Sequence, residues 1–164
     1  MTATDLSNAP DWFGPYLFPP LFILLWIGVC HFVAFRGGWK ELASVYTSTP
    51  GFIGTRYHFQ SGRMCGGMNY NNMLTVGTDV YALYLSVFSL FSIGHSPICI
   101  PWEEISANFQ KGFLGRSVKL EFRRCPNVHI IIGERLSRKL VEGSGGRFRV
   151  PEETYDSPRI SKTT

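Results

Sequence analysis

The stretch YLFPPLFILLWIGVCHFVAF, residues 16–35, divides the chain into a short N-terminal segment and a larger C-terminal part. It contains no charged residue over about twenty positions, which is the length needed to cross a bilayer core of roughly 30 Å. A helix in the core of a soluble protein shows a polar stripe, and this run has none. We therefore predict a transmembrane helix. Its anchor residues are Leu21, Phe22, Ile23, Leu24, Leu25, Trp26, Ile27 and Val29.

A cleaved signal peptide is the alternative to a retained anchor. Signal peptides carry basic residues before the apolar run and a small-residue cleavage site after it. Here Asp5 and Asp11 precede the run without any Lys or Arg, and the following AFRGGWK is a poor cleavage site. Pro19 and Pro20 are tolerated in a first turn or kink the helix, so a helix that dips into one leaflet is a second alternative.

The distribution of basic residues predicts the orientation of the anchor. Every Lys and Arg follows Phe35, beginning with Arg36 and Lys40, and basic residues beside a membrane segment stay cytoplasmic. We therefore expect residues 1–15 to face outward and the C-terminal domain to be cytoplasmic. The net charge of +4 is mild and its cations are scattered, which favours anionic lipid over nucleic acid as a partner.

The four cysteines, Cys30, Cys65, Cys99 and Cys125, contain no C-x-x-C pair. Zinc sites usually show closely spaced ligand pairs, so we predict neither a metal nor another cofactor. Cysteines in a cytosolic domain are most often buried or inert thiols. A thiol enzyme that uses Cys65 or Cys99 remains an alternative function.

Residues 36–55 are predicted to form an amphipathic helix and a linker. Trp39, Leu42, Ala43 and Tyr46 have the spacing of one helical face. We expect this helix to lie on the membrane surface and to connect the anchor to the domain.

Residues 56–142 alternate with a period of two between turn signals, which predicts about seven short strands. The expected strands lie within residues 56–63, 72–77, 80–87, 98–102, 105–109, 118–123 and 128–132. A terminal helix follows at 134–142, with Leu136 and Leu140 on the face that would plug a small barrel. Residues 143–164 are rich in Gly, Ser, Pro and charges, which predicts a disordered tail.

The segments LTVGTDVYALYLSV, ICIPWEEI, VKLEF and VHIIIGERLSRKLVEG resemble the pleckstrin-homology-like (PH-like) modules of bacteria, including the GRAM-like ones. The corner IPWEEI, residues 100–105, is the most specific part of a resemblance that covers roughly residues 56–142. The whole chain looks like small bacterial membrane-anchored proteins of unassigned function with such a domain. The resemblance implies an α+β, mainly β fold, a seven-stranded small barrel capped by a C-terminal helix. It does not imply lipid binding, because a fold does not fix a function.

The same corner contains two adjacent carboxylates, Glu103 and Glu104. Neighbouring side chains on a strand point to opposite faces, so these two are not expected to converge for acid–base catalysis. We expect Trp102 to pack on the barrel and both glutamates to turn toward solvent. No catalytic residue is predicted.

Two segments carry candidate binding residues. The glycine-rich loop SGRMCGGMNYNN, residues 61–72, is set between strands, where binding loops are common. Its candidates are Arg63, Met64, Met68, Tyr70 and Asn71. A basic hairpin contributes Lys119, Arg123 and Arg124, with Lys111 and Arg116 nearby. Its cations can contact anionic headgroups at about 1 kcal/mol each, or they can simply keep a strand edge solvated.

These observations predict a single-pass membrane protein, anchored in the bilayer through residues 16–35, that is not an enzyme. Its cytosolic domain is expected to be a binding or scaffold module for a protein partner or for lipid headgroups. Tethering raises the effective concentration, so even a weak module is useful there. A structural subunit of a larger membrane complex remains a further alternative.

Overall fold

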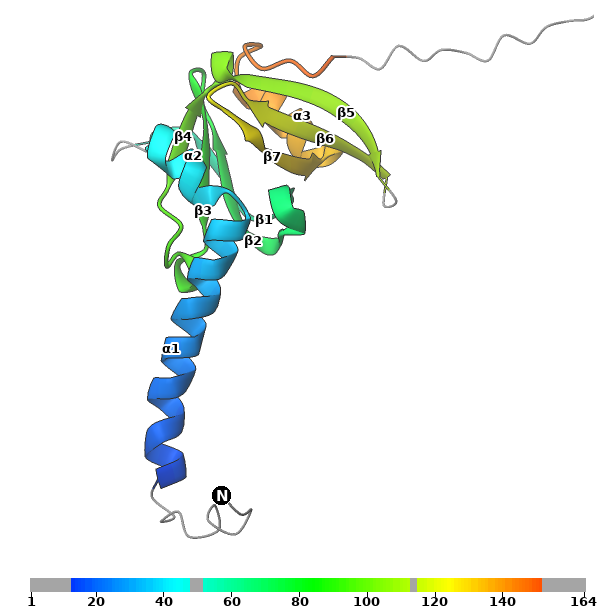
Figure 1. Cartoon of the computed structure of the whole chain (residues 1–164). Helices are drawn as coiled ribbons and strands as arrows, with labels where there is room; N and C mark the ends of the chain where they lie inside the picture. Colours follow the sequence, from blue (N-terminus) through cyan, green and yellow to red (C-terminus); the bar gives the residue numbers. More distant parts are fainter. Residues whose placement is uncertain (1–12, 48–51, 113–114, 152–164) are drawn as a thin grey trace, which may run out of the picture.

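The structure, a computed structural model, describes residues 13–47, 52–112 and 115–151 (Figure 1). Its helices are α1 (Phe13–Arg36), α2 (Trp39–Val45) and α3 (Glu134–Gly143), and its strands are β1 (Thr55–Met64), β2 (Asn69–Thr78), β3 (Ala82–Val87), β4 (Ile98–Pro101), β5 (Ile105–Gly112), β6 (Gly115–Phe122) and β7 (Cys125–Gly133). The described residues also contain the short 3₁₀ turns η2 (Cys65–Gly67), η3 (Ser89–Phe91) and η4 (Trp102–Glu104).

The strands form one antiparallel sheet in the order β4-β3-β2-β1-β7-β6-β5. The alternation predicted for residues 118–123 is present: Val118, Leu120 and Phe122 are buried, while the residues between them are half-buried. This sheet and the helix after it confirm the predicted α+β, mainly β class. β4 and β5 are the two ends of the sheet, and η4 connects them.

Strand β1 lies at the centre of the sheet and is bent. Its pairing with β2 shifts register between Tyr57 and Gln60 and again between Gln60 and Gly62, and Phe59 has a φ of 55°. Such bulges bend a strand and increase its twist. Consequently β1 pairs with β7 only over Gly62–Met64, and β2–β4 and β5–β7 extend to either side of it (Figure 1).

The inner faces of the strands, helices α2 and α3, and Ala34 near the end of α1 enclose one apolar core. Its largest fully buried side chains are Trp39, Tyr70, Phe122, Phe148, Leu42, Met64, Leu74, Leu83, Leu85, Ile98, Ile100 and Leu120. Helix α3 contacts β2, β6 and β7. Its residues Leu136 and Leu140 are buried, as the sequence predicted.

Helix α2 is present as predicted, but its apolar face does not lie on the membrane surface. Trp39 and Leu42 are completely buried, and Tyr46 is nearly so. They belong to the core cluster, and α2 contacts β7. The expectation of a surface-bound helix is therefore wrong, because the domain core already covers the face that the spacing marked as apolar.

The segment after α3 also differs from the sequence prediction, which placed a disordered tail from Gly143 onward. Ser144 and Phe148 are buried, and the Phe148 N–H donates to the Ser144 hydroxyl at 3.1 Å. The Phe148 ring stacks on Trp102 with a centroid separation of 5.0 Å. This first part of the segment thus belongs to the domain core, and residues 152–164 lie outside the described residues.

Helix α1 extends away from the sheet (Figure 1). In the described residues it is the one helix that is long and apolar enough to cross a membrane, over Tyr16–Arg36, and little of its apolar stretch is buried. Among the predicted anchor residues, Trp26 and Ile27 are half-buried and the others are exposed. Pro19 and Pro20 lie inside the helix.

Candidate functional site

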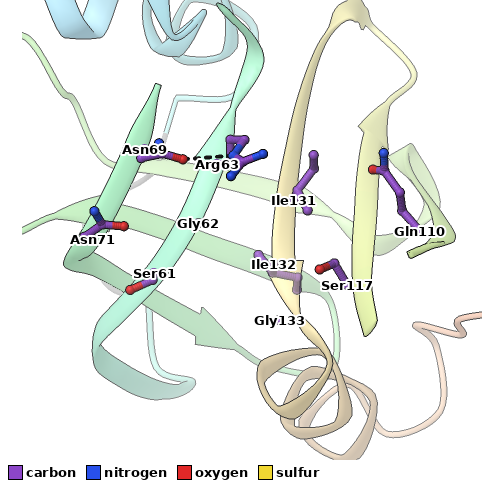
Figure 2. A pocket seen from close by; sticks show the side chains of 10 residues that line it. All are labelled: Ser61, Gly62, Arg63, Asn69, Asn71, Gln110, Ser117, Ile131, Ile132 and Gly133. Atoms are coloured by element: carbon purple, nitrogen blue, oxygen red, sulfur yellow. Dashed lines mark hydrogen bonds between the residues drawn. The ribbon is translucent and has the colours of Figure 1, made fainter. Parts of the chain in front are cut away.

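A pocket with a volume of about 310 Å³ and a mixed polar and apolar lining lies on the outer face of the sheet where β1 meets β7 (Figure 2). Its lining comes from five strands: Ser61, Gly62 and Arg63 of β1, Asn69 and Asn71 of β2, Gln110 of β5, Ser117 of β6, and Ile131, Ile132 and Gly133 of β7. A Cβ atom on Gly62 would lie 3.0 Å from the Leu74 side chain, so position 62 faces the core. Ser61 and Arg63, its neighbours on the strand, therefore point outward into the pocket.

Arg63 provides the positive charge of this pocket. Its Nε–H donates to Asn69 Oδ1 at 2.9 Å, across the β1–β2 pair in which these residues are opposite one another. This bond holds the guanidinium in place, and its two terminal NH₂ groups make no hydrogen bond to the part of the chain that the structure describes. They can therefore bind an anion in the bidentate geometry that arginine favours.

The rest of the lining supplies neutral polar groups and an apolar base. Asn71 and Gln110 are exposed, Ser117 is half-buried, and Ile131 is half-buried between them on β7. Gln110 and Ser117 are paired across β5 and β6. Amide and hydroxyl groups both donate and accept hydrogen bonds, so the pocket is suited to a ligand with one negative charge and several hydroxyl or carbonyl groups.

The pocket lies next to the end of α1. Arg63 and Asn69 flank the hairpin tip that contains η2, and the Cys65 thiol in η2 donates to the Gly37 carbonyl at 3.1 Å. Gly38, with φ of 74°, allows the chain to turn from α1 into α2, and a Cβ atom there would lie 2.9 Å from Cys65 Sγ. Figure 1 shows η2 beside the domain end of α1.

The loop residues predicted to bind are divided between the pocket and the core. Arg63 and Asn71 line the pocket. Met64 and Tyr70 are buried, and Met68 is half-buried against the core cluster. Strand alternation could have predicted this division. It continues through both arms of the hairpin, so every second side chain points into the core.

Tyr70 belongs to a buried polar cluster beneath this hairpin. Its hydroxyl lies 3.0 Å from His95 Nε2, and His95 Nδ1 lies 3.2 Å from the Ile93 carbonyl. A carbonyl only accepts, so Nδ1 carries the proton and Nε2 accepts from the Tyr70 hydroxyl. Burial lowers the pKa of His95 and raises the pKa of Tyr70, which keeps both groups neutral and points to a structural role.

The described cations of the basic hairpin do not line the pocket. Lys119 pairs with Glu121 at 2.7 Å, and Arg123 is exposed in the β6–β7 turn. Arg124 pairs with Glu104 at 3.3 Å and lies over the Tyr46 ring. The Arg116 guanidinium lies over the Phe109 ring. The side chain of Lys111 is outside the described residues.

The IPWEEI corner follows the expectation only in part. Trp102 is buried and Glu103 is exposed, as predicted. Glu104 is half-buried, because it accepts from the Tyr46 hydroxyl at 3.1 Å in addition to its ion pair with Arg124. The prediction that it turns toward solvent is wrong, and its partners make it a link between α2 and the β6–β7 turn.

The four cysteines are free thiols. Burial raises the pKa of both Cys65 and Cys99, which lowers the thiolate fraction that a nucleophile needs. His95 faces Tyr70 and Ile93 rather than a thiol. Among the described residues, no group of three His, Cys, Asp or Glu side chains is placed to hold a metal ion.

Comparisons with models of protein families, with curated proteins and with solved structures gave no match to this chain. The PH-like resemblance of the sequence therefore stays a prediction. The features of this chain that bear on its function are the geometry of the pocket and its position beside α1.

Proposed function

We propose that this chain is a single-pass membrane protein whose PH-like domain is held at the cytoplasmic face of the bilayer and binds the anionic headgroup of a lipid. The observation that carries the proposal is the position of Arg63, which lies in the mixed polar and apolar pocket beside the domain end of α1. Seven antiparallel strands and a following helix are consistent with a PH-like domain. The seven-stranded sheet would then correspond to the barrel that the resemblance implies.

The chemistry of the pocket supports a phosphate-bearing headgroup. The Arg63 guanidinium would bind two phosphate oxygens, since its planar fork matches phosphate geometry. Asn71, Gln110 and Ser117 would bond to headgroup hydroxyls, and Ile131 would contact the glycerol carbons. One cation makes a weak site, but a domain tethered to the same bilayer needs little affinity to be occupied.

A binding role is also favoured over the thiol enzyme considered from the sequence. The raised pKa of Cys65 and Cys99 works against a nucleophilic thiolate. A carboxylate of a protein partner could engage the same guanidinium, but no feature of the pocket favours it over a phosphate. A lipid headgroup would also engage the neutral polar side chains of the pocket, Asn71, Gln110 and Ser117.

We expect Arg63→Ala to raise the Kd for glycerophosphoglycerol about tenfold or more, because hydrogen bonds to charged groups contribute about 1.5–3 kcal/mol. The measurement is calorimetric titration of the full chain in phosphatidylcholine nanodiscs. Arg123→Ala is the matched control, since it removes the same charge from an exposed position outside the pocket lining. It should change the Kd by less than about twofold. Equal losses in both variants would show general electrostatic attraction instead of a site.

The orientation is tested by protease access to the full chain in sealed membrane vesicles. Since basic residues beside α1 stay cytoplasmic, we expect the β domain to be cut in vesicles whose cytoplasmic face is outward. In vesicles of the opposite orientation it should be protected until detergent is added. Cleavage only in vesicles of the opposite orientation would show that the β domain faces away from the cytoplasm. Its lipid ligand would then lie in the outer leaflet.

A further inference from the structure

The connection between β3 and β4 forms a second apolar surface beside α1. Phe88, Leu90 and Ile93 are exposed large apolar residues, and residues 88–94 contain no charge. The Phe91 ring contacts the Trp26 ring of α1 with a centroid separation of 4.9 Å, and the Trp26 indole N–H donates to the Leu90 carbonyl at 3.3 Å. Figure 1 shows this loop alongside the domain-proximal half of the helix.

Between the loop and the helix lies a groove with a volume of about 420 Å³. Its lining is entirely apolar except for the Trp26 indole N–H: Phe22, Ile23, Trp26 and Ile27 from α1, and Leu90 and Ile93 from the loop. The groove is thus continuous with the exposed apolar surface of α1. An apolar surface of this kind is unfavourable in water.

The length of α1 places this loop at the depth of the bilayer. The part of the helix below the Trp26 contact, Phe13–Leu25, rises only about 20 Å at 1.5 Å per residue. A bilayer core is roughly 30 Å thick, and Asp11 precedes the helix. If α1 spans the membrane, the hydrocarbon must therefore extend past Trp26 and reach the loop.

Several polar backbone groups of the loop have partners within the protein. Polar backbone groups inside hydrocarbon must be satisfied within the protein. The Phe91 N–H donates to the Phe88 carbonyl at 2.8 Å, and the Ser92 hydroxyl donates to the Ser89 carbonyl at 2.7 Å. The Leu90 carbonyl accepts from the indole of α1, so the turn presents mainly apolar side chains outward.

We propose that the β3–β4 loop is a second membrane contact, immersed in the leaflet beside α1, with lipid acyl chains filling the groove. This inference rests on the membrane placement proposed above. Phe59 of β1 is exposed and lies 5.9 Å from the Phe88 ring, which extends the immersed surface onto the sheet. Two contacts would fix how the domain sits on the bilayer, whereas a helix joined through Gly37 and Gly38 alone would leave it free to tilt.

The test places the photo-crosslinking residue benzoylphenylalanine in the full chain in phospholipid nanodiscs, followed by mass spectrometry of the adducts. We expect Leu90→benzoylphenylalanine to form phospholipid adducts. Phe22→benzoylphenylalanine, on the exposed face of α1, is the positive control and should form them too. Arg123→benzoylphenylalanine, in the β6–β7 turn, is the negative control and should not. All three positions are exposed, so the larger side chain does not disturb the core.

The outcomes separate this inference from the proposed function. Lipid adducts at Phe22 without any at Leu90 would leave the membrane anchor intact and overturn the immersed loop. Adducts between Leu90 and another polypeptide would also overturn it, because the groove would then be a protein interface. A lack of lipid adducts at Phe22 would contradict the membrane placement, and with it both proposals.

Discussion

Replacing Trp39 with alanine is expected to lower the free energy of unfolding by about 3–5 kcal/mol, the range typical of large aromatic deletions in a core. The side chain is completely buried, and its ring contacts Tyr70 and His95 at centroid separations of 5.9 and 5.2 Å. Its indole N–H donates to the Ser96 carbonyl at 2.8 Å. The substitution would leave a cavity and would remove the donor to the Ser96 carbonyl.

The measurement is urea unfolding of the full chain in detergent micelles, followed by circular dichroism of the β domain. Trp39→Phe keeps most of the packing but loses the hydrogen bond, and should cost about 1–3 kcal/mol. Lys40→Ala, exposed on the same helix, should change stability by less than about 0.5 kcal/mol. If Trp39→Ala behaved like Lys40→Ala, α2 would lie on the membrane surface, as the sequence alone suggested.

Phe148→Ala is the second substitution with a large expected effect, again about 3–5 kcal/mol of destabilisation. The ring is buried and stacks on Trp102, whose indole N–H donates to the Asp79 carbonyl at 2.9 Å. Removing the ring would open the side of the core where the segment after α3 meets η4.

The same unfolding experiment checks this prediction, with Arg149→Ala as the neighbouring control. Arg149 is exposed, so its replacement should leave stability within about 0.5 kcal/mol. A Phe148→Ala variant as stable as that control would mean that the segment after α3 contributes nothing to the fold. It would thereby restore the prediction of a tail without structure.

Much of the fold could be predicted because its signals are local. The alternation in residues 118–123 predicts β6, and the spacing of Leu136 and Leu140 predicts α3. Each pattern reports one repeated geometry of the backbone, with a period of 2 for strands and 3.6 for helices. The burial of Phe148 has no such signal, because one aromatic residue in a Gly- and Ser-rich segment makes no period.

Only the part of the candidate site that comes from β1 and β2 could be predicted from the sequence. Arg63 and Asn71 were visible as polar residues near a glycine-rich turn. Gln110 and Ser117 join them only because β7 pairs with both β1 and β6 and so brings distant strands together. No local pattern in β5 or β6 distinguishes these two residues from other outward-facing ones.

Local patterns in the chain show which segments are apolar and with what period. They mark an uncharged run long enough to span a bilayer, a helical face at Trp39, and seven alternating strands. What covers each apolar surface depends on how the elements pack together. This packing buries Trp39 in the domain and leaves Leu90 exposed beside α1. The physical reason is that apolar burial is non-directional. A sequence pattern shows that an apolar face will be buried away from water. Only the packing of the folded chain shows whether protein or lipid covers that face.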